Sequence, residues 1–357
     1  EYSRWDMLFA FVGTNVEAEA FNVMYNQFLE DEKSEYPSLL AKWLPSPGTK
    51  NPNGTKELAV KVARAFKMPL DVYRKRRAAL NRKIKTVEIF MSAQNWDEID
   101  FEKVPARAFM IYQKAFERHG YEKMEKHIEK IQSGEVKVKS DTLYPHDIMK
   151  KALNASGNEI ITLQNAWDNL PNYVGDGRKG MAIIDTSGSM EGLYWGGTQR
   201  TVEPILVAKS LGLYLSERLT GPYKDHYITF SEEPIMAKFH GETLARKYKN
   251  MRGICANTNI EAVFELILSV AVSNRLPQED LPTHLYIFSD MEFDACVISN
   301  STQGNYYGRK ANVNRTLFEK IRDRYDSYGY RLPQVIFWNL DGRSNQHPVK
   351  QHETGAA

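Results

Sequence analysis

Cysteine is scarce in this chain: Cys255 and Cys296 are the only two among 357 residues. Two cysteines exclude a disulfide framework and a four-cysteine zinc site. No run of 18 apolar residues occurs, so no transmembrane span is expected. The first residues, Glu1 to Trp5, lack the basic-then-apolar pattern of a secretory signal, and they also lack a starting Met, which suggests a trimmed or mature fragment. A reducing, cytoplasmic setting without a membrane partner is therefore the expectation.

An excess of one charge is also missing, since the formal net charge is only +2. Hydrophobic residues make up 42% of the chain, which excludes a disordered or collagen-like protein and is enough for two cores. At roughly 150 residues per domain, the length suggests two domains.

The first half of the chain has the apolar spacing of helices. Short breakers, such as Pro45 to Gly48 and Asn51 to Gly54, separate the helical segments. The predicted helices are Val16 to Glu30, Thr55 to Lys67, Leu70 to Met91, Ala106 to His119, Tyr121 to Ile131 and Ile160 to Leu170, with one weak strand candidate at Glu135 to Lys139. This pattern predicts an all-α domain, either a bundle or an irregular solenoid.

The second half alternates strands with helices, which is typical of a doubly wound α/β domain with a mostly parallel sheet. The predicted strands are residues 180–185, 227–230, 284–288 and 334–338, with a weak fifth at 234–239, and the predicted helices are 203–219, 260–272 and 314–328. The Gly-containing linker from Asn172 to Lys179 places the boundary near 175. We therefore expect a helical domain at residues 1–175 and an α/β domain at 176–357.

Three polar loops follow or precede these elements at the edge where an open α/β sheet binds ligands. They are Asp185 to Ser189 after the first strand, Gly253 to Asn259 before a helix, and Ser289 to Asp294 after the third confident strand. Apart from Cys255 they offer carboxylates, hydroxyls and amides, which suit a hard cation such as Mg²⁺ or Mn²⁺. The alternatives are an acidic turn at a strand end and, for Glu292 and Asp294, solvated loop charge or helix capping.

The run Asp185-Thr186-Ser187-Gly188-Ser189 resembles the Asp-x-Ser-x-Ser signature of von Willebrand factor A domains. That resemblance implies a Rossmann-like fold with a metal-ion-dependent adhesion site. It implies metal contacts from the hydroxyls of Ser187 and Ser189, from Thr258 and Asp290, and from Asp185 directly or through water. Such domains commonly have six strands, so we expect this chain to lack a final strand and helix, or to have them supplied from elsewhere.

The whole chain resembles a narrower family, found in plants, fungi, giant viruses and phages, that joins a helical region to a von Willebrand factor A domain. Its layout is similar to that of the Ro autoantigens, whose helical-repeat ring binds small structured RNA. The matching segments are Lys42 to Pro45, Tyr73-Arg74, Trp96 to Ile99, Leu143 to Pro145, Phe288 to Asp294 and Phe337 to Leu340.

Enzyme motifs are missing. No His-Glu-x-x-His, no P-loop lysine and no Gly-x-Ser-x-Gly elbow occurs, and position 187 is Ser where a phosphoryl-transfer site would need a second Asp. We therefore expect no catalysis, with a metal-dependent hydrolase as a distant third hypothesis.

Positive charge gathers in one segment: twelve Lys or Arg and only two acids lie between Lys50 and Lys85. On a helix, Arg74, Arg77, Arg82 and Lys85 would form one stripe, with apolar residues on another, as expected for phosphate contact. The alternative is a solvated face partly neutralised by acidic neighbours such as the Glu30 to Glu35 run.

The leading hypothesis is divalent-cation-dependent binding of a macromolecule. The partner would be a protein whose acidic side chain completes the metal site. The alternative is a Ro-like protein that binds structured RNA through the basic helical face.

Overall fold

The computed structural model describes residues 4–48, 55–195, 198–231, 233–253, 259–290 and 315–341. It divides into two compact units. The first comprises the described residues up to Val104 together with Lys114–Met124, and the second comprises Pro105–Gln113 and the described residues from Glu125 onward. Among the described helices, none combines the length and the low polarity needed to cross a membrane.

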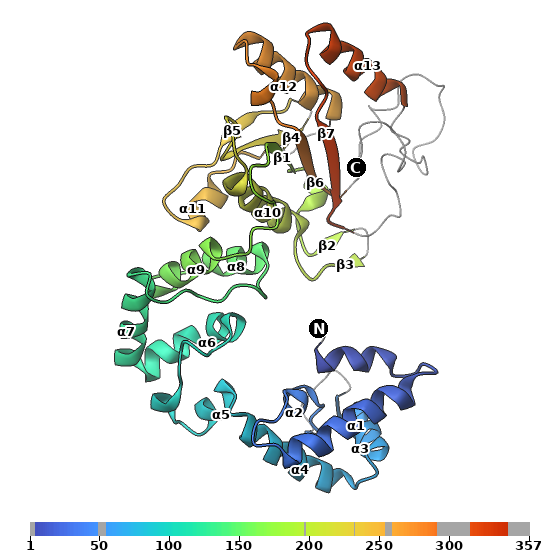
Figure 1. Cartoon of the computed structure of the whole chain (residues 1–357), viewed down its shortest axis with the longest axis vertical. Helices are drawn as coiled ribbons and strands as arrows, with labels where there is room; N and C mark the ends of the chain where they lie inside the picture. Colours follow the sequence, from blue (N-terminus) through green and yellow to red (C-terminus); the bar gives the residue numbers. More distant parts are fainter. Residues whose placement is uncertain are drawn as a thin grey trace. The chain divides into compact units, whose positions relative to one another are not determined.

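The first unit is helical and has its own core (Figure 1). Phe28 and Phe66 are fully buried in this core, where their ring centroids lie 5.3 Å apart. Tyr73 is buried beside them and donates a hydrogen bond to the Pro45 carbonyl at 2.8 Å. The described elements are η1 (Trp5–Phe11), α1 (Glu17–Lys33), α2 (Leu40–Trp43), α3 (Thr55–Ala65), α4 (Leu70–Ile84), α5 (Val87–Ser92) and η2 (Trp96–Glu98).

The helix predicted over residues 70–91 is two helices, so this prediction is wrong at its middle. Lys85 has a φ of 53°, which ends α4 in the left-handed conformation, and extended Thr86 precedes α5. A left-handed residue cannot continue a right-handed helix, because its carbonyl leaves the hydrogen-bond ladder. Lys85 therefore lies beyond the end of α4, although the sequence pattern predicts it as part of that helix.

The second unit is built on a sheet in the order β5-β4-β1-β6-β7. The neighbouring pairs β4–β1, β1–β6 and β6–β7 are parallel, and β5 joins β4 antiparallel. The strands are β1 (Gly180–Asp185), β4 (His226–Phe230), β5 (Met236–Lys238), β6 (His284–Ser289) and β7 (Gln334–Asn339), with a separate hairpin of β2 (Tyr194–Trp195) and β3 (Thr198–Gln199).

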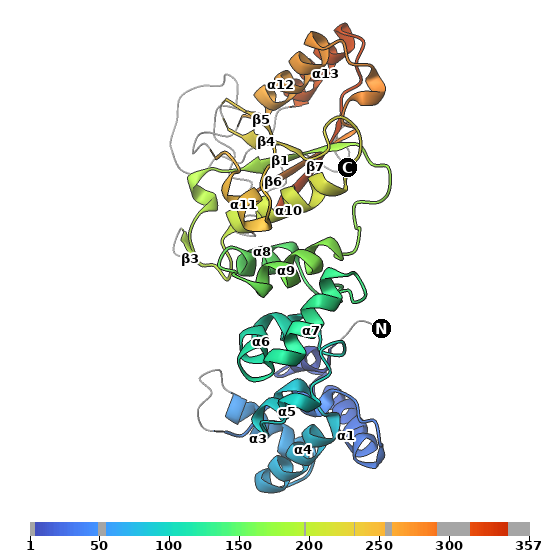
Figure 2. The same cartoon turned by 90° about the vertical axis from the view of Figure 1, so that its left-hand side faces the viewer.

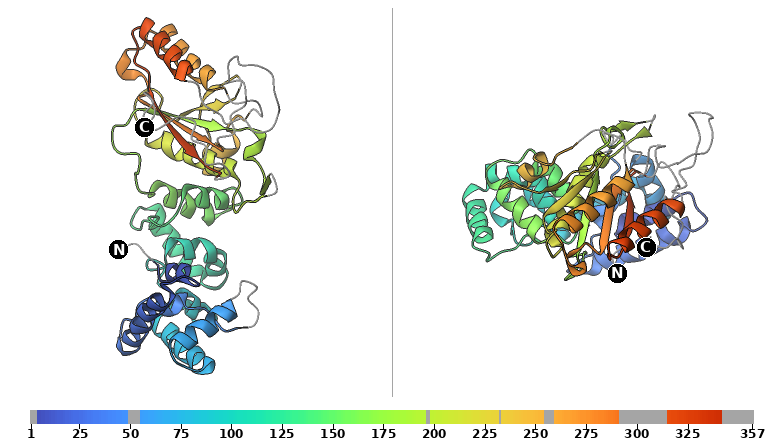
Figure 3. Two further views of the ribbon diagram at one scale, coloured as in Figure 1. Left: turned by 90° about the vertical axis from the view of Figure 1, so that its right-hand side faces the viewer. Right: turned by 90° about the horizontal axis from the view of Figure 1, so that it is seen from above.

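Helices cover both faces of this sheet. Ala182 and Ile184 of β1 face one core, and Met181 and Ile183 face the other, as a strand buried on both sides requires. Figures 2 and 3 show α12 and α13 on one side and α10 on the other. The remaining described helices of the chain, not all of which contact the sheet, are α6 (Ala106–His119), α7 (Tyr121–Gln132), α8 (Pro145–Ala152), α9 (Asn158–Asp168), α10 (Pro204–Arg218), α11 (Leu244–Lys249), α12 (Ile260–Ser273) and α13 (Arg315–Ser327), with short turns η3 (Gly188–Met190) and η4 (Gln278–Asp280).

The helices α8 and α9 pack against the sheet domain (Figure 2). Trp167 of α9 is buried and donates its indole N–H to Glu217 of α10 at 2.7 Å, and Lys247 of α11 pairs with the other oxygen of Glu217 at 2.5 Å. Arg218 donates to the Trp167 carbonyl at 3.0 Å. These two helices thus belong to the second compact unit, although they precede the linker at residue 175.

The broad prediction of a helical region followed by a mixed α/β sheet domain is confirmed. The weak strand at 234–239 is present as β5, whereas residues 135–139 form no strand; there the Val138 N–H donates to the Asn165 side chain at 2.9 Å instead. The expected absence of a final strand concerns residues 343–357, which lie outside the described residues.

The contact between α10 and β1 can be tested at Gly212. A Cβ there would lie 2.5 Å from Cδ1 and 2.9 Å from Cγ1 of Ile184, whose side chain is buried. We expect Gly212→Ala to lower the free energy of unfolding by about 1–3 kcal/mol through overpacking. Adding Ile184→Val should recover part of that loss, because it removes Cδ1, so the two changes should couple in a double-mutant cycle.

Urea unfolding would measure both variants, with Gly48→Ala as the control, because its new Cβ would meet only Ser46 Oγ at 3.7 Å. Additive effects of Gly212→Ala and Ile184→Val would contradict the proposed contact.

Candidate metal centre at the sheet edge

The carboxyl ends of β1 and β6 form the point where the chain turns to opposite faces of the sheet. From β1 the chain continues to α10 on one face, while α13, the next described helix after β6, lies on the other. The register aligns Ile184 with Phe288, so Asp185 and Ser289 end their strands side by side. Open α/β sheets bind ligands at such switch points.

Asp185 is completely buried at this edge. Its Oδ1 accepts a hydrogen bond from the Ser187 N–H at 2.9 Å, and its Oδ2 accepts one from the Ser289 hydroxyl at 2.5 Å. The pKa of the Asp185 carboxyl is raised to about 6, chiefly by burial; the hydrogen bonds act to lower this pKa, and the nearby charge of Asp290 acts to raise it. Burial of the ionised form is therefore the largest electrostatic cost at this position.

The four other predicted ligands have different outcomes. The hydroxyl oxygens of Ser187 and Ser189 lie 3.1 Å apart, so the loop brings both to one point. Asp290 is 2% exposed and follows Ser289 directly, so two buried carboxylates lie at the ends of adjacent strands. Thr258 lies outside the described residues.

The second polar loop is described only at its two ends. A Cβ on Gly253 would lie 3.7 Å from Thr186 Cβ, so this end of the loop reaches the β1 loop. At the other end, the Asn259 side chain caps α12 by accepting from the Ala262 N–H at 3.1 Å. The part between them, with Thr258 and Cys255, lies outside the described residues, as does Cys296.

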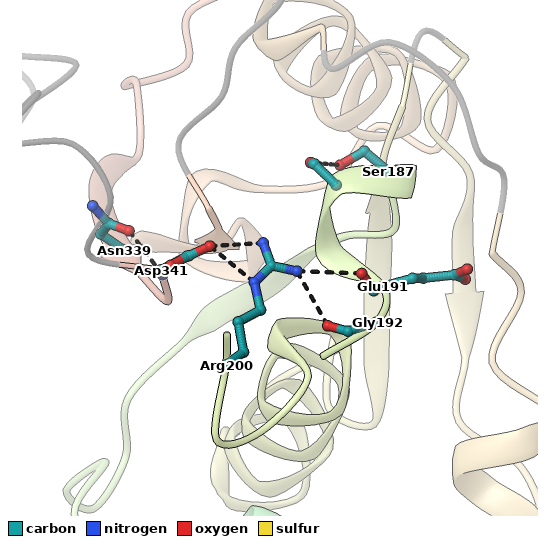
Figure 4. Close-up of polar contacts among 7 residues, drawn as sticks. Ser187, Glu191, Gly192, Arg200, Asn339 and Asp341 are labelled. Carbon is teal, nitrogen blue, oxygen red and sulfur yellow. Dashed lines mark hydrogen bonds and ion pairs between the residues drawn. The ribbon is translucent and has the colours of Figure 1, made fainter. Parts of the chain in front are cut away.

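Arg200 holds the loop that carries the two serines (Figure 4). Its guanidinium donates to Asp341 Oδ2 from Nη2 at 2.7 Å and from Nε at 3.1 Å, and from Nη1 to the carbonyls of Glu191 and Gly192 at 3.2 and 3.3 Å. Both charged side chains are largely buried, at 6% and 13% exposure. These contacts of Arg200, called the clamp below, join the segment after Ser189 to Asp341, which follows β7.

The donors at this edge fit a small hard cation. Adjacent oxygens around octahedral Mg²⁺, at about 2.1 Å from the ion, lie about 3 Å apart; the Ser187 and Ser189 hydroxyls already have that separation. Two buried carboxylates side by side also favour a positive charge between them. In the part of the chain that the structure describes, no group of three or more His, Cys, Asp or Glu side chains is suited to a metal, so any site here depends on hydroxyl ligands.

The four predicted phosphate-contacting residues lie in different surroundings. Arg74, Arg82 and Lys85 are exposed. Arg77 is half-buried and donates from Nε to the Leu44 carbonyl at 2.8 Å, and desolvation lowers the pKa of its guanidinium. Arg77 therefore contributes to the fold of the first unit, and the exposed basic face is narrower than the sequence pattern predicts.

A helical region joined to a mixed α/β sheet domain, with buried acids at the sheet edge, is the class of protein that the fold defines. Residues 179–357 match the family model described as a domain of unknown function, DUF7788, and residues 24–172 match another described as a domain of unknown function, DUF2828. The first match spans half of the chain, so the chain belongs to the DUF7788 family. The two matches meet at the linker around residue 175.

A protein of Acanthamoeba polyphaga mimivirus, described as "Uncharacterized protein L728", is 28% identical over 337 residues. The match covers 89% of this chain but only 55% of that protein, so this chain spans about half of its relative's length. Among solved structures, the Deinococcus radiodurans RO (RSR) protein is similar at 12% identity with a TM-score of 0.37, covering 93% of this chain and 72% of that one. No conclusion about function follows from a structural likeness of that size.

The raised pKa of Asp185 predicts a pH effect on stability. A carboxyl whose pKa is about 6 when folded and 3.8 when unfolded holds its proton more tightly in the folded state. The contribution of Asp185 to stability is therefore greatest below pH 4 and falls as the pH rises through 6, by up to about 3 kcal/mol. Asp185→Asn should remove this loss.

Thermal unfolding in chelator between pH 4 and 7.5 would measure the difference between the wild type and Asp185→Asn. We expect the variant to be the more stable protein at pH 7, with the difference shrinking toward pH 4. Parallel pH profiles would show that Asp185 does not titrate in this range.

Proposed function

We propose that the sheet domain is of von Willebrand factor A type and that its carboxyl edge is a metal-ion-dependent adhesion site. Asp185, Ser187, Ser189 and Asp290, with Thr258 from the second loop, would hold Mg²⁺ or Mn²⁺. The single observation that carries the proposal is the pair of buried carboxylates beside two hydroxyls that lie 3.1 Å apart.

The strand order also supports this assignment. A central β1 that ends in the Asp-x-Ser-x-Ser loop, flanked by β4 and β6, puts all the candidate ligands except Thr258 on two adjacent strand ends. The bound cation would supply a positive charge with open coordination positions. Since Mg²⁺ binds few protein oxygens and usually keeps waters, a partner's carboxylate can replace one of those waters.

The proposed activity is binding rather than catalysis, and the proposed partner is a protein with an acidic side chain. The side chains of this edge act by orienting the cation: the Ser289 hydroxyl and the Ser187 N–H fix the Asp185 carboxylate. RNA binding through the helical unit is the second candidate, favoured by the exposed Arg74, Arg82 and Lys85.

Removal of two ligands tests the metal site. Asp185→Ala combined with Ser187→Ala should abolish Mg²⁺ and Mn²⁺ binding in calorimetric titration while circular dichroism remains unchanged, because these residues end a strand rather than fill the core. Ser216→Ala is the control, since its hydroxyl bonds the Leu213 carbonyl within α10. Unchanged metal affinity in the double variant would exclude the adhesion site.

The clamp at Arg200 gives a second, graded test. Arg200→Lys keeps the positive charge but not the fork that joins Asp341 to the loop carbonyls. Because the clamp supports the serine loop without touching the proposed ion, we expect metal affinity to fall about tenfold, as is typical for residues that support ligands from behind. An unchanged affinity together with normal stability would show that the clamp does not position the site.

Affinity purification from cells with and without chelator then tests the partner. Proteins that are lost on chelation, and that the double variant also fails to retain, would support the proposal. Retention of the same partners by the double variant would contradict it.

A further inference from the structure

The first unit contains a groove of about 870 Å³ that lies between two of its helices. One wall comes from α1 and the turn before it, and the other from α3 and the residues that follow it. The two helices share one core, which includes Met24 and Phe28 of α1 and Val62 of α3. This volume falls within the range of pockets that hold a small organic ligand, about 300–1,000 Å³.

The α3 wall of the groove is basic. Lys61 and Arg64 lie one turn apart on α3, Lys67 follows the helix, and all three side chains are exposed. Within the described residues, no carboxylate forms an ion pair with any of them. The acid in the groove lining, Glu17, accepts a hydrogen bond from the Gly13 N–H. The groove therefore has a net positive charge.

The α1 wall offers amide groups and an aromatic ring. Asn22 and Asn26 lie one turn apart and are exposed, and Tyr25 lies half-buried between them. The Tyr25 ring is held against Phe66, with centroids 5.3 Å apart and a tilt of 43°. A carboxamide both donates and accepts hydrogen bonds, and a fixed aromatic ring can stack on a flat heterocycle.

We propose that this groove binds a nucleotide, either free or as one unit of a single strand. Lys61, Arg64 and Lys67 hold the phosphate, and Asn22, Asn26 and Tyr25 contact the base. Cations opposite amides and an aromatic ring match the two parts of a nucleotide, which are an anionic phosphate and a flat base with donors and acceptors.

The neighbouring helix α4 carries more basic residues, but several of them already have partners. Arg76 forms an ion pair with Glu32 and lies over the Phe28 ring at 5.3 Å. Lys83 donates to the Glu32 carbonyl at 2.8 Å. These contacts hold α4 to α1. The α3 cations, by contrast, line a groove of the size that a ligand requires.

Removal of two cations tests the phosphate contacts. Fluorescence anisotropy with a labelled 12-nucleotide oligoadenylate, on the full chain in chelator, compares the wild type with Lys61→Gln/Arg64→Gln. We expect at least a tenfold loss of affinity at low salt. The slope of log K against log salt should become shallower by about 0.7, because the two cations act on one phosphate of the strand and each neutralised phosphate contributes about 0.7. Gln retains helix propensity, so α3 should persist.

Lys150→Gln/Lys151→Gln is the matched control, since it removes the same charge from exposed positions of α8. It should change affinity less than twofold. Equal losses of affinity in both double variants would show that the effect comes from net charge alone and would overturn the proposal. A wild type that binds no oligonucleotide would also overturn it.

The base contacts have their own variant. Tyr25→Leu should weaken oligoadenylate binding severalfold without a change in the salt slope, because stacking releases no counterions. Wild-type binding that Tyr25→Leu leaves intact would refute the role of the α1 wall.

Calorimetry with AMP and with inorganic phosphate separates the two sources of the ligand. If AMP binds as tightly as the oligonucleotide, the groove is assigned to free nucleotides. If the oligonucleotide binds much more tightly than AMP, the groove is assigned to a strand. Phosphate binding as tightly as AMP would contradict the base contacts. Because these measurements are made in chelator, their outcome is independent of the proposed metal site.

Discussion

The burial of the Asp185 carboxylate is the constraint on which the arrangement of the sheet edge depends. An ionised carboxyl in a dry site is unfavourable, and the pKa of about 6 expresses that cost. The Ser289 hydroxyl, placed by the parallel pairing of β1 with β6, and the Ser187 N–H, from the turn after β1, offset part of it. Asp290 adds a second carboxylate beside the first. An edge built this way is more stable with a proton or a cation than without one.

Much of the fold could be predicted because the sheet strands are buried on both faces. The apolar runs at Gly180–Asp185 and His284–Ser289 stand out from their polar surroundings, and their parallel pairing follows from alternation with helices. Short elements were missed: α8 has only eight residues, and its burial depends on α10, which lies more than fifty residues later. The break at Lys85 was missed because Lys has no intrinsic preference for a left-handed backbone, so the sequence contains no signal for it.

The candidate site could be predicted only in its local part. Asp185, Ser187 and Ser189 lie within five residues, so their proximity follows from one turn. Ser289 and Arg200 had no such signal. Ser289 reaches Asp185 across 104 positions of sequence, and Arg200 meets Asp341 across 141. Contacts at such separations depend on strand order and on side-chain direction, which residue spacing does not encode.

The basic segment shows why a count of charges predicts a binding surface poorly. Counted together, the cations of α3 and α4 suggest one continuous phosphate-binding face. In the fold they divide: Arg76 and Lys83 bond Glu32 at the acidic end of α1, and Arg77 bonds the Leu44 carbonyl after α2. Lys61 and Arg64 form no ion pair within the described residues and line the groove together with Phe21 and Tyr25 of α1. Position relative to the acidic end of α1, and not charge density, thus separates the cations that stabilise the unit from those available to a ligand.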